Sequence, residues 1–148
     1  MPMRIYYLFI IKKDYVRIYR KNGLVLYRTL ENLFHLKQYD FSYGLSIYEQ
    51  LCQTFAVTVL ENYISSRFVV KPIGKKAMQV HSLIETTIIE INPSCVIIKT
   101  NRNFPDILKI FHIYNRHIFV CDFKSGNYFW LSEQIQKRSQ LLSGQSIH

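Results

Sequence analysis

The chain has little of the chemistry that marks secreted or membrane-spanning proteins. It contains only three cysteines, an odd number, and no pair stands at the spacing of metal ligands. This argues against a disulfide framework, and the apolar surroundings of Cys52, Cys95 and Cys121 favour buried side chains in a reducing compartment. The apolar run from Ile5 to Ile11 is too short to cross a bilayer, and no small-residue cleavage site accompanies it. We therefore expect a cytoplasmic protein without a membrane partner.

Acidic residues are also scarce. The sequence has 10 Asp and Glu against 19 Lys and Arg, a formal charge of +9 at pH 7. A basic surface suits nucleic acid, a membrane surface or an acidic protein partner, although a soluble protein can be basic without any such role. Hydrophobic residues make up 49% of the 148 positions, which is ample for a packed core. The length indicates one domain, for which we expect residues 1–142, followed by a flexible C-terminal tail over 143–148.

The clearest structural signal is a hairpin near the C-terminus. Residues 117–131 read HIFVCDFKSGNYFWL, in which two β-branched and aromatic runs flank a short polar link. Gly126 and Asn127 in this link both tolerate a positive φ and suit the reversal. Phe119 and Trp130, on the two strands, should be buried, because strand aromatics beside a tight turn usually pack on a helix.

Other segments extend this reading to an α/β domain. Arg4–Ile11 predicts a strand buried on both faces, and Thr86–Ile91 with Cys95–Thr100 predicts a second hairpin. We expect a mixed sheet of about five strands, built from the N-terminal strand and the two hairpins and covered by helices. The segments with mainly helical signals are Lys12–Lys21, Leu24–Phe34, Pro105–Tyr114 and a short helix after Leu131.

The middle of the chain is harder to interpret. The spacing over Ile47–Phe68 leaves two alternatives, a helix or a strand followed by a helix. His35–Ser46 is rich in polar residues and glycine, and it predicts a loop. Val69–Gln79 is basic and contains proline and glycine, so it also predicts a loop.

No set of residues forms a recognisable catalytic or metal site. His112 and His117 are close in sequence, but a structural or surface histidine is the favoured interpretation over a shared metal ion. Asp122 precedes a turn, where an acid can do acid–base work but more often bonds the turn backbone. The apolar strand around Cys121 should raise the pKa of its thiol and disfavour a reactive thiolate. We expect no enzymatic activity, no cofactor and no bound metal.

Nucleic-acid binding is the alternative function that the charge leaves open. Aromatic residues suitable for stacking on bases are plentiful, but most lie in apolar runs and are expected in the core. No recognition-helix or RNP-like signature accompanies the basic residues. These basic residues are scattered along the chain, at Lys75, Lys76, Lys99, Arg102, Arg116 and Lys124.

The two ends of the chain carry a pattern that resembles a known family. Residues 6–19 read YYLFIIKKDYVRIY, and residues 122–131 read DFKSGNYFWL. The sporulation inhibitor of replication (SirA) family of endospore-forming bacteria similarly has Tyr-Tyr, an apolar run, Ile-Lys, an aromatic residue, three residues and Tyr. At its C-terminal end the family reads Asp-Phe-x-Ser, two residues and Tyr-x-Trp-Leu. The resemblance covers residues 1–35 and 86–131, where the order of predicted elements also fits.

The resemblance implies an α/β protein that binds the N-terminal domain of the replication initiator DnaA. Such binding would block new rounds of chromosome replication as the cell enters sporulation. In the family the binding surface lies around the first helix, where two aromatic positions match Tyr15 and Tyr19. On a helix these two residues share a face with Ile18 beside them, and Lys13 and Arg17 would flank the pair and steer an acidic partner. Spacing alone favours a face turned to the core, and the resemblance favours the partner-binding surface that we predict.

Overall fold

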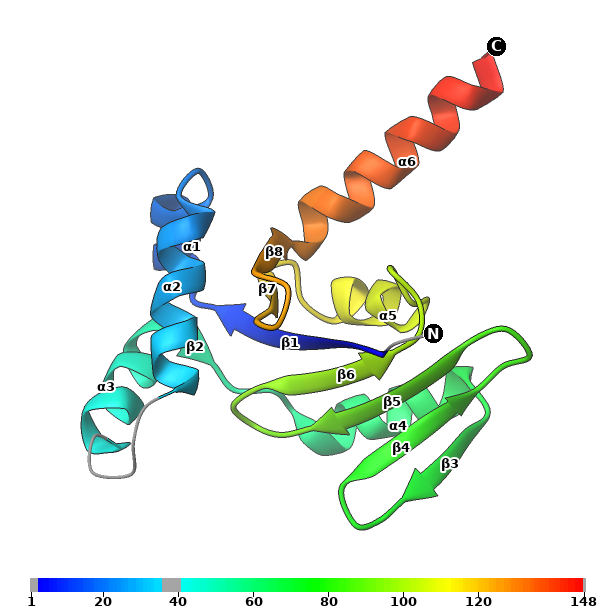
Figure 1. Cartoon of the computed structure of the whole chain (residues 1–148), viewed down its shortest axis with the longest axis horizontal. Coiled ribbons are helices and arrows are strands. Elements are labelled where there is room, and N and C mark those ends of the chain that lie inside the picture. Colours follow the sequence, from blue (N-terminus) through cyan, green and yellow to red (C-terminus); the bar gives the residue numbers. More distant parts are fainter. Residues whose placement is uncertain (1–2, 36–40, 148) are drawn as a thin grey trace.

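A sheet of eight strands runs through the part of the chain that the computed structural model describes, residues 3–35 and 41–147. The side chains of residues 41–43 and 142–147 lie outside this description. In chain order the strands are β1 (Arg4–Ile11), β2 (Cys52–Gln53), β3 (Val70–Ile73), β4 (Ala77–His81), β5 (Thr86–Ile91), β6 (Val96–Thr100), β7 (Ile118–Asp122) and β8 (Asn127–Trp130). Their order in the sheet is β3-β4-β5-β6-β1-β7-β8, with β2 paired to the end of β1 (Figure 1).

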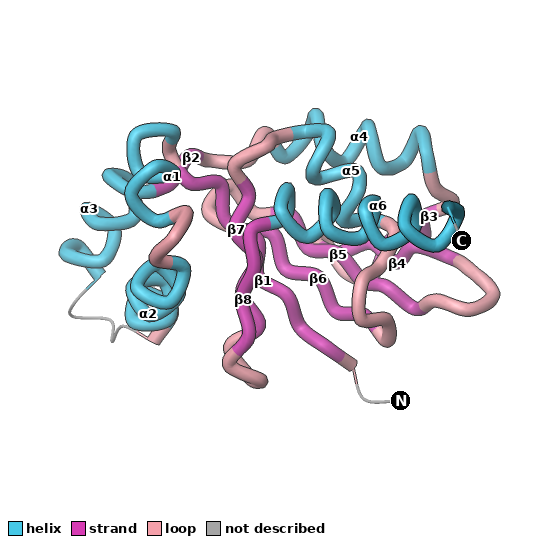
Figure 2. Tube along the Cα trace, turned by 90° about the horizontal axis from the view of Figure 1, so that it is seen from above, coloured by secondary structure: helices cyan, strands magenta, loops and turns pink. Residues whose placement is uncertain are grey.

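Six helices accompany this sheet within the described residues. They are α1 (Lys13–Tyr19), α2 (Gly23–Phe34), α3 (Phe41–Leu51), α4 (Val57–Arg67), α5 (Ile107–Tyr114) and α6 (Leu131–Ile147). Helices α4, α5 and α6 lie along one face of the sheet. Helices α1 and α3 lie near the end of β1, and α2 lies beside β8 on the other face of this part of the sheet (Figure 2). The single α/β domain expected from the sequence is confirmed, and the sheet does not close into a barrel.

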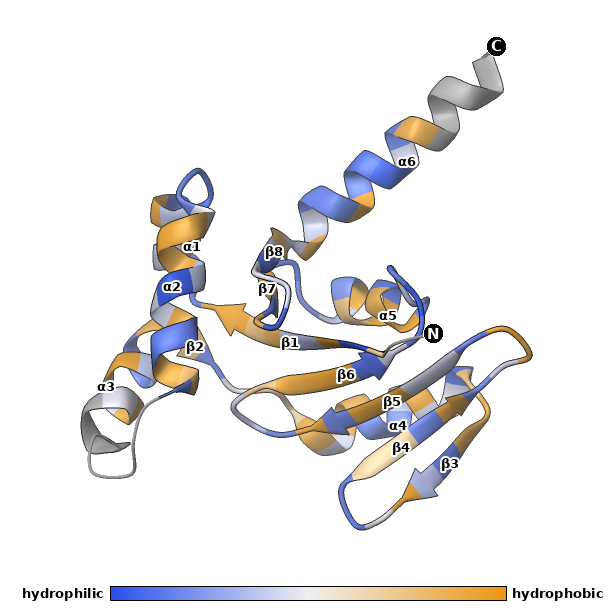
Figure 3. Cartoon of the chain, in the orientation of Figure 1, coloured by the Kyte–Doolittle hydropathy of each residue, from blue (hydrophilic) through white to orange (hydrophobic). Residues whose placement is uncertain are grey.

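The strand β1 supplies side chains to two hydrophobic cores because successive residues point to opposite faces. Tyr6, Leu8 and Ile10 join the larger core, which includes residues of α4 and α5. Phe9 and Ile11 join a second core with residues of α1, α2 and the β7–β8 hairpin. Hydrophobic residues accordingly fill the second half of β1 and most of β6 (Figure 3). The prediction of a strand buried on both faces is confirmed for this part of β1.

The C-terminal hairpin forms as the sequence predicted. Phe119 is fully buried and Trp130 is 4% exposed, and their rings lie 4.9 Å apart at 64°. Gly126 adopts a φ of 73° in the turn, whereas Asn127 is already the first residue of β8. Thr86–Ile91 also pairs with the strand after Cys95, as predicted.

The sheet is larger than the predicted five strands, and every pairing in the described residues is antiparallel rather than mixed. The segment Val69–Gln79, predicted as a loop, contains β3 and the start of β4. This hairpin turns at Gly74, with a φ of 62°, and its outer strand carries Pro72. Proline suits an edge strand because no further strand needs its missing N–H. The hairpin is only partly buried, so its sequence lacks the apolar pattern of a central strand.

The middle of the chain also differs from expectation. Helix α3 begins at Phe41, so the predicted loop His35–Ser46 is wrong from that residue on, and 36–40 lie outside the described residues. Neither alternative for Ile47–Phe68 holds as stated, because the end of α3, the short β2 and then α4 share this segment. Strand β2 exists through its pairing with Ile10 and Ile11 of β1, which is a tertiary contact.

The last helix, α6, is longer than the short helix that the sequence predicted. It continues to Ile147, and the side chains of the expected tail, residues 143–148, lie outside the described residues. The division between a domain of residues 1–142 and a flexible tail stays a prediction. No helix in the described ranges is both long enough and apolar enough to span a lipid bilayer.

Candidate partner-binding surface

Helix α1 follows β1 directly and is held at its start by the backbone. The amide of Ile11 donates to the carbonyl of His117 (2.9 Å), and the amide of Lys12 donates to the carbonyl of Leu51 (2.9 Å). Asp14 lies in the first turn, near the positive end of the helix dipole, and Arg17 lies in the last turn, near its negative end. Both charges therefore stabilise the helix. Two neighbouring segments therefore fix the direction in which this seven-residue helix leaves the sheet.

The apolar residues of α1 divide into three levels of burial. Val16 is 7% exposed and belongs to the second core. Tyr15 and Tyr19 are half-buried and pack against that core, with their rings stacked at 6.5 Å and 19°. Ile18 is 57% exposed. The stripe is thus neither wholly core nor wholly surface: Val16 anchors the helix, and Ile18 with the accessible parts of both tyrosines faces solvent.

Basic side chains occupy another side of α1. Lys13, Arg17 and Arg20 line a hollow of about 170 Å³ together with Val16 and His117. Arg20 also forms an ion pair of 3.7 Å with Glu133 of α6, and both side chains are about half exposed, so the pair adds little stability. The five residues that the sequence proposed therefore lie on one short helix, with the cations Lys13 and Arg17 exposed.

Sequence reasoning missed several residues of this region. Arg20 and His117 reach the hollow beside Lys13, and His117 comes from the start of the β7–β8 hairpin. Leu24 and Val25, in the first turn of α2, are 47% and 54% exposed. The sequence carried a signal for these two residues. The buried residues of α2 recur at helical spacing on one side of the helix, and Leu24 and Val25 fall on a different side.

Groups that could do chemistry are dispersed elsewhere in the fold. No group of three potential metal ligands occurs among the described residues. Asp122 bonds its turn, as predicted: its Oδ1 accepts from the amide of Ser125 (3.1 Å), and its carbonyl accepts from the amide of Gly126 (2.9 Å). His112 is half-buried on α5, and His117 lies beside α1.

The three cysteines are free thiols, of which Cys52 and Cys121 are buried and Cys95 is half-buried. Burial raises the pKa of Cys52 and of Cys95 to about 12, and it raises the pKa of Cys121 as well. Because the thiolate is the reactive form, we expect modification by a disulfide reagent at about pH 8 to be at least about tenfold slower than in the unfolded protein. Colorimetric thiol titration with and without denaturant measures this, and rapid labelling of any cysteine in the native state would contradict it.

No protein-family model matches the chain, and no curated protein is significantly similar to it.

Proposed function

We propose that the protein is a non-enzymatic inhibitor of chromosome replication initiation at sporulation, acting by binding the N-terminal domain of DnaA through α1. The observation that carries the proposal is the exposure of Ile18 beside the stacked, half-buried pair Tyr15 and Tyr19. The resemblance of residues 6–19 to the SirA family supports the choice of partner, because that family binds DnaA through the same aromatic positions.

The composition of the α1 surface favours a protein partner. Tyrosine offers a rigid apolar ring with a polar tip, and aromatic centres with a polar rim are typical of interface hot spots. Lys13 and Arg17 are exposed on the same helix, on the side that lines the hollow with Arg20. An acidic patch on the initiator domain would complement these two cations and would be approached faster at low salt.

Binding to nucleic acid is the second candidate. Lys13, Arg17, Arg20 and His117 converge on one hollow, which could hold a phosphate of a DNA backbone. Ile18 and the two tyrosines do not line this hollow, so a phosphate contact there would leave the exposed apolar surface of α1 unused.

The test is to mix the purified protein with the isolated N-terminal domain of DnaA and, separately, with duplex DNA at physiological salt. We expect a complex with the domain and weak, strongly salt-dependent binding to DNA. No complex with the domain, together with tight DNA binding, would reverse the order of the two candidates.

Reversing two charges on α1 tests whether these cations steer the encounter with the initiator domain, or whether the net positive charge of the whole protein does. The double variant Lys13→Glu, Arg17→Glu should slow association with the initiator domain about tenfold and reduce its dependence on salt. The matched control is Lys71→Glu, Lys75→Glu on the β3–β4 hairpin, which changes the net charge equally on exposed residues. Stopped-flow kinetics should show normal association for the control. Equal slowing in both variants would mean that overall charge, rather than the α1 surface, drives the encounter.

A further inference from the structure

One face of the sheet carries no helix over β3, β4, β5 and β6 in the part of the chain that the structure describes (Figure 1). Helices α4, α5 and α6 lie along the opposite face, and α2 lies on this face beside β8 (Figure 2). Successive residues of a strand point to opposite faces, so the side chains on this face alternate with those that enter the larger core. The four strands therefore present one side to the core and the other to solvent.

The register of the strands arranges the solvent-facing residues in two rows across the sheet. The first row, in the order β3, β4, β5, β6 and β1, is Lys71, Gln79, Ile88, Lys99 and Ile5. The second row, in the same order, is Ile73, Ala77, Glu90, Ile97 and Tyr7. Each row extends about 19 Å, and the rows lie about 7 Å apart, at the usual spacings of a sheet. We call these ten residues the open face.

The centre of the open face is aliphatic. Antiparallel sheets with one solvated face usually place apolar residues inward and polar residues outward. Here Ile88 and Ile97 point outward on the neighbouring strands β5 and β6, with Ile5 and Ile73 on the strands beyond them. All four are half-buried, and none belongs to either hydrophobic core. A partner that covered them would remove apolar surface from water.

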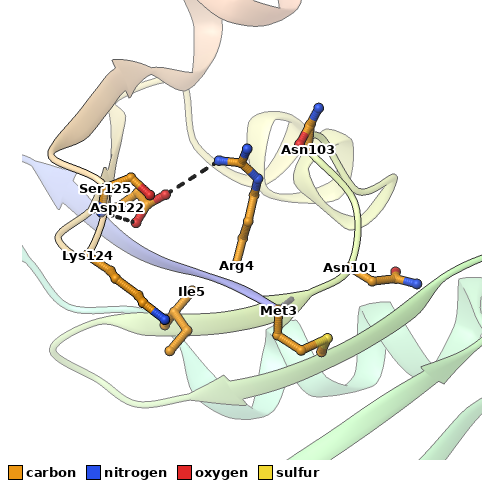
Figure 4. A pocket seen from close by; sticks show the side chains of 8 residues that line it. All are labelled: Met3, Arg4, Ile5, Asn101, Asn103, Asp122, Lys124 and Ser125. Carbon is orange, nitrogen blue, oxygen red and sulfur yellow. Dashed lines mark hydrogen bonds and ion pairs between the residues drawn. The ribbon is translucent and has the colours of Figure 1, made fainter. Parts of the chain in front are cut away.

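Lysines surround this aliphatic centre. Lys71 and Lys99 are exposed in the first row, and neither forms an ion pair within the described residues. Lys124, in the turn after β7, extends the row past β1, because its side chain lies beside Ile5 and both residues border one hollow (Figure 4). Arg4 does not contribute, since Figure 4 shows its guanidinium on the other side of β1. The open face therefore has three cations along one side.

The charge pattern selects the chemistry of the partner. The three lysines stand against one carboxylate, that of Glu90, which accepts a hydrogen bond from the side-chain amide of Asn92 (2.9 Å). A second copy of this chain would bring the same lysines against these, and like charges disfavour that contact. An acidic surface is complementary to the lysines.

The side chains of the open face also distinguish between classes of acidic partner. Tyr7 is the single aromatic residue among the ten, and Phe34 and Phe123 already pack on its ring at 4.9 Å and 5.1 Å, so a nucleic-acid base has no ring to stack on. Isoleucines that are half-buried between strands do not enter a bilayer, so a lipid surface would contact only the lysines. A protein surface with both carboxylates and aliphatic side chains uses both parts of the face.

We propose that the open face docks an acidic amphipathic helix of a protein partner. The apolar stripe of that helix covers Ile88 and Ile97, and the carboxylates beside the stripe pair with Lys71, Lys99 and Lys124. A helix with one apolar stripe packs on an apolar sheet face in the same way as α4 and α5 pack on the other face. This surface lies on different elements from α1 and does not depend on the function proposed above.

The test is an NMR titration of the ¹⁵N-labelled full chain with two matched peptides of about 18 residues, long enough for several helical turns. One peptide carries leucines at helical spacing flanked by glutamates, and the other has lysine in place of each glutamate. We expect saturable binding of the acidic peptide, with amide shift changes centred on β5 and β6. The basic peptide should bind about tenfold more weakly or less.

Charge reversal on the open face separates this surface from the basic protein as a whole. The double variant Lys71→Glu, Lys99→Glu should weaken binding of the acidic peptide about tenfold or more. The matched control is Arg116→Glu, Lys137→Glu, which makes the same change in net charge at exposed positions outside the open face. The control should keep the affinity of the parent, and thermal melting reports whether each variant is folded.

Ile88→Thr tests the apolar part of the contact. Threonine keeps the β-branched shape that suits a strand but removes apolar surface, so the acidic peptide should bind about threefold more weakly or less. The matched control is Val59→Thr on α4, where the valine is 61% exposed on the other side of the sheet. This variant should bind the peptide like the parent.

Several results would overturn the proposal. These are no saturable binding of the acidic peptide, equal binding of the basic peptide, shift changes centred outside the open face, or equal weakening by the two double charge reversals. Displacement of the bound peptide by phosphatidylglycerol vesicles or by a single-stranded oligonucleotide at physiological salt would assign the face to a lipid surface or to nucleic acid instead.

Discussion

Ile18→Arg is expected to weaken binding to the N-terminal domain of DnaA by about 100- to 1,000-fold, roughly 3–4 kcal/mol. In the free protein Ile18 is 57% exposed, so the arginine extends into solvent and leaves no cavity. In the complex, the same position is the apolar centre of the proposed interface, where an unpaired guanidinium would lose its hydration. Calorimetry measures the affinity, and the melting temperature of the free variant should stay close to that of the parent.

The control for Ile18→Arg is Leu83→Arg, which puts the same charge on an exposed leucine before β5. It should bind the initiator domain like the parent. Tyr15→Ala and Tyr19→Ala are expected to cost about 2 kcal/mol of binding each, roughly thirtyfold. Because both rings pack partly against the second core, each change should also lower the free energy of unfolding, by about 1 kcal/mol. Ile18 therefore separates binding from folding more cleanly than the tyrosines do.

Phe119→Ala is expected to lower the free energy of unfolding by about 3–5 kcal/mol. The ring is fully buried, and it contacts Trp130 and Tyr128 with ring centres 4.9 Å and 5.8 Å away. Its loss would leave a cavity between β7, β8 and α2, where the hairpin and the helices of the second core meet. Urea unfolding followed by tryptophan fluorescence measures the change, since Trp130 is the single tryptophan of the chain.

Phe34 supplies the matched control for this stability prediction. It lies at the end of α2 and is 49% exposed, so Phe34→Ala should cost about 1 kcal/mol. A loss below about 1 kcal/mol for Phe119→Ala would mean that the core around the hairpin does not pack as described.

The sequence predicted the strands whose hydrophobic pattern follows directly from their burial. Strand β1 is apolar because it lies between two cores, and the β5–β6 and β7–β8 hairpins have apolar runs around short turns. The β3–β4 hairpin escaped prediction because it is partly buried at the sheet edge and carries Pro72 and several lysines. Strand β2 depends on pairing with Ile10 and Ile11, which no local pattern encodes.

The candidate surfaces were predictable only in part for a similar reason. The spacing of Tyr15 and Tyr19 placed them side by side, but their half-burial depends on how α1 packs on the second core. His117 reaches α1 because its carbonyl accepts from the amide of Ile11 across the sheet. The ion pair between Arg4 and Asp122 depends on the register of β1 and β7, so the sequence offered only the role of Asp122 in its turn.

The most direct test of the central claim is a footprint of the initiator domain on this protein by NMR. The unlabelled N-terminal domain of DnaA is titrated into ¹⁵N-labelled protein, and amide shift changes are followed along the chain. We predict the largest changes over Lys13–Tyr19 and the first turn of α2, with little change in the β3–β4 hairpin. An absence of shifts at saturating domain, or shifts centred on the β3–β4 hairpin instead, would contradict the account.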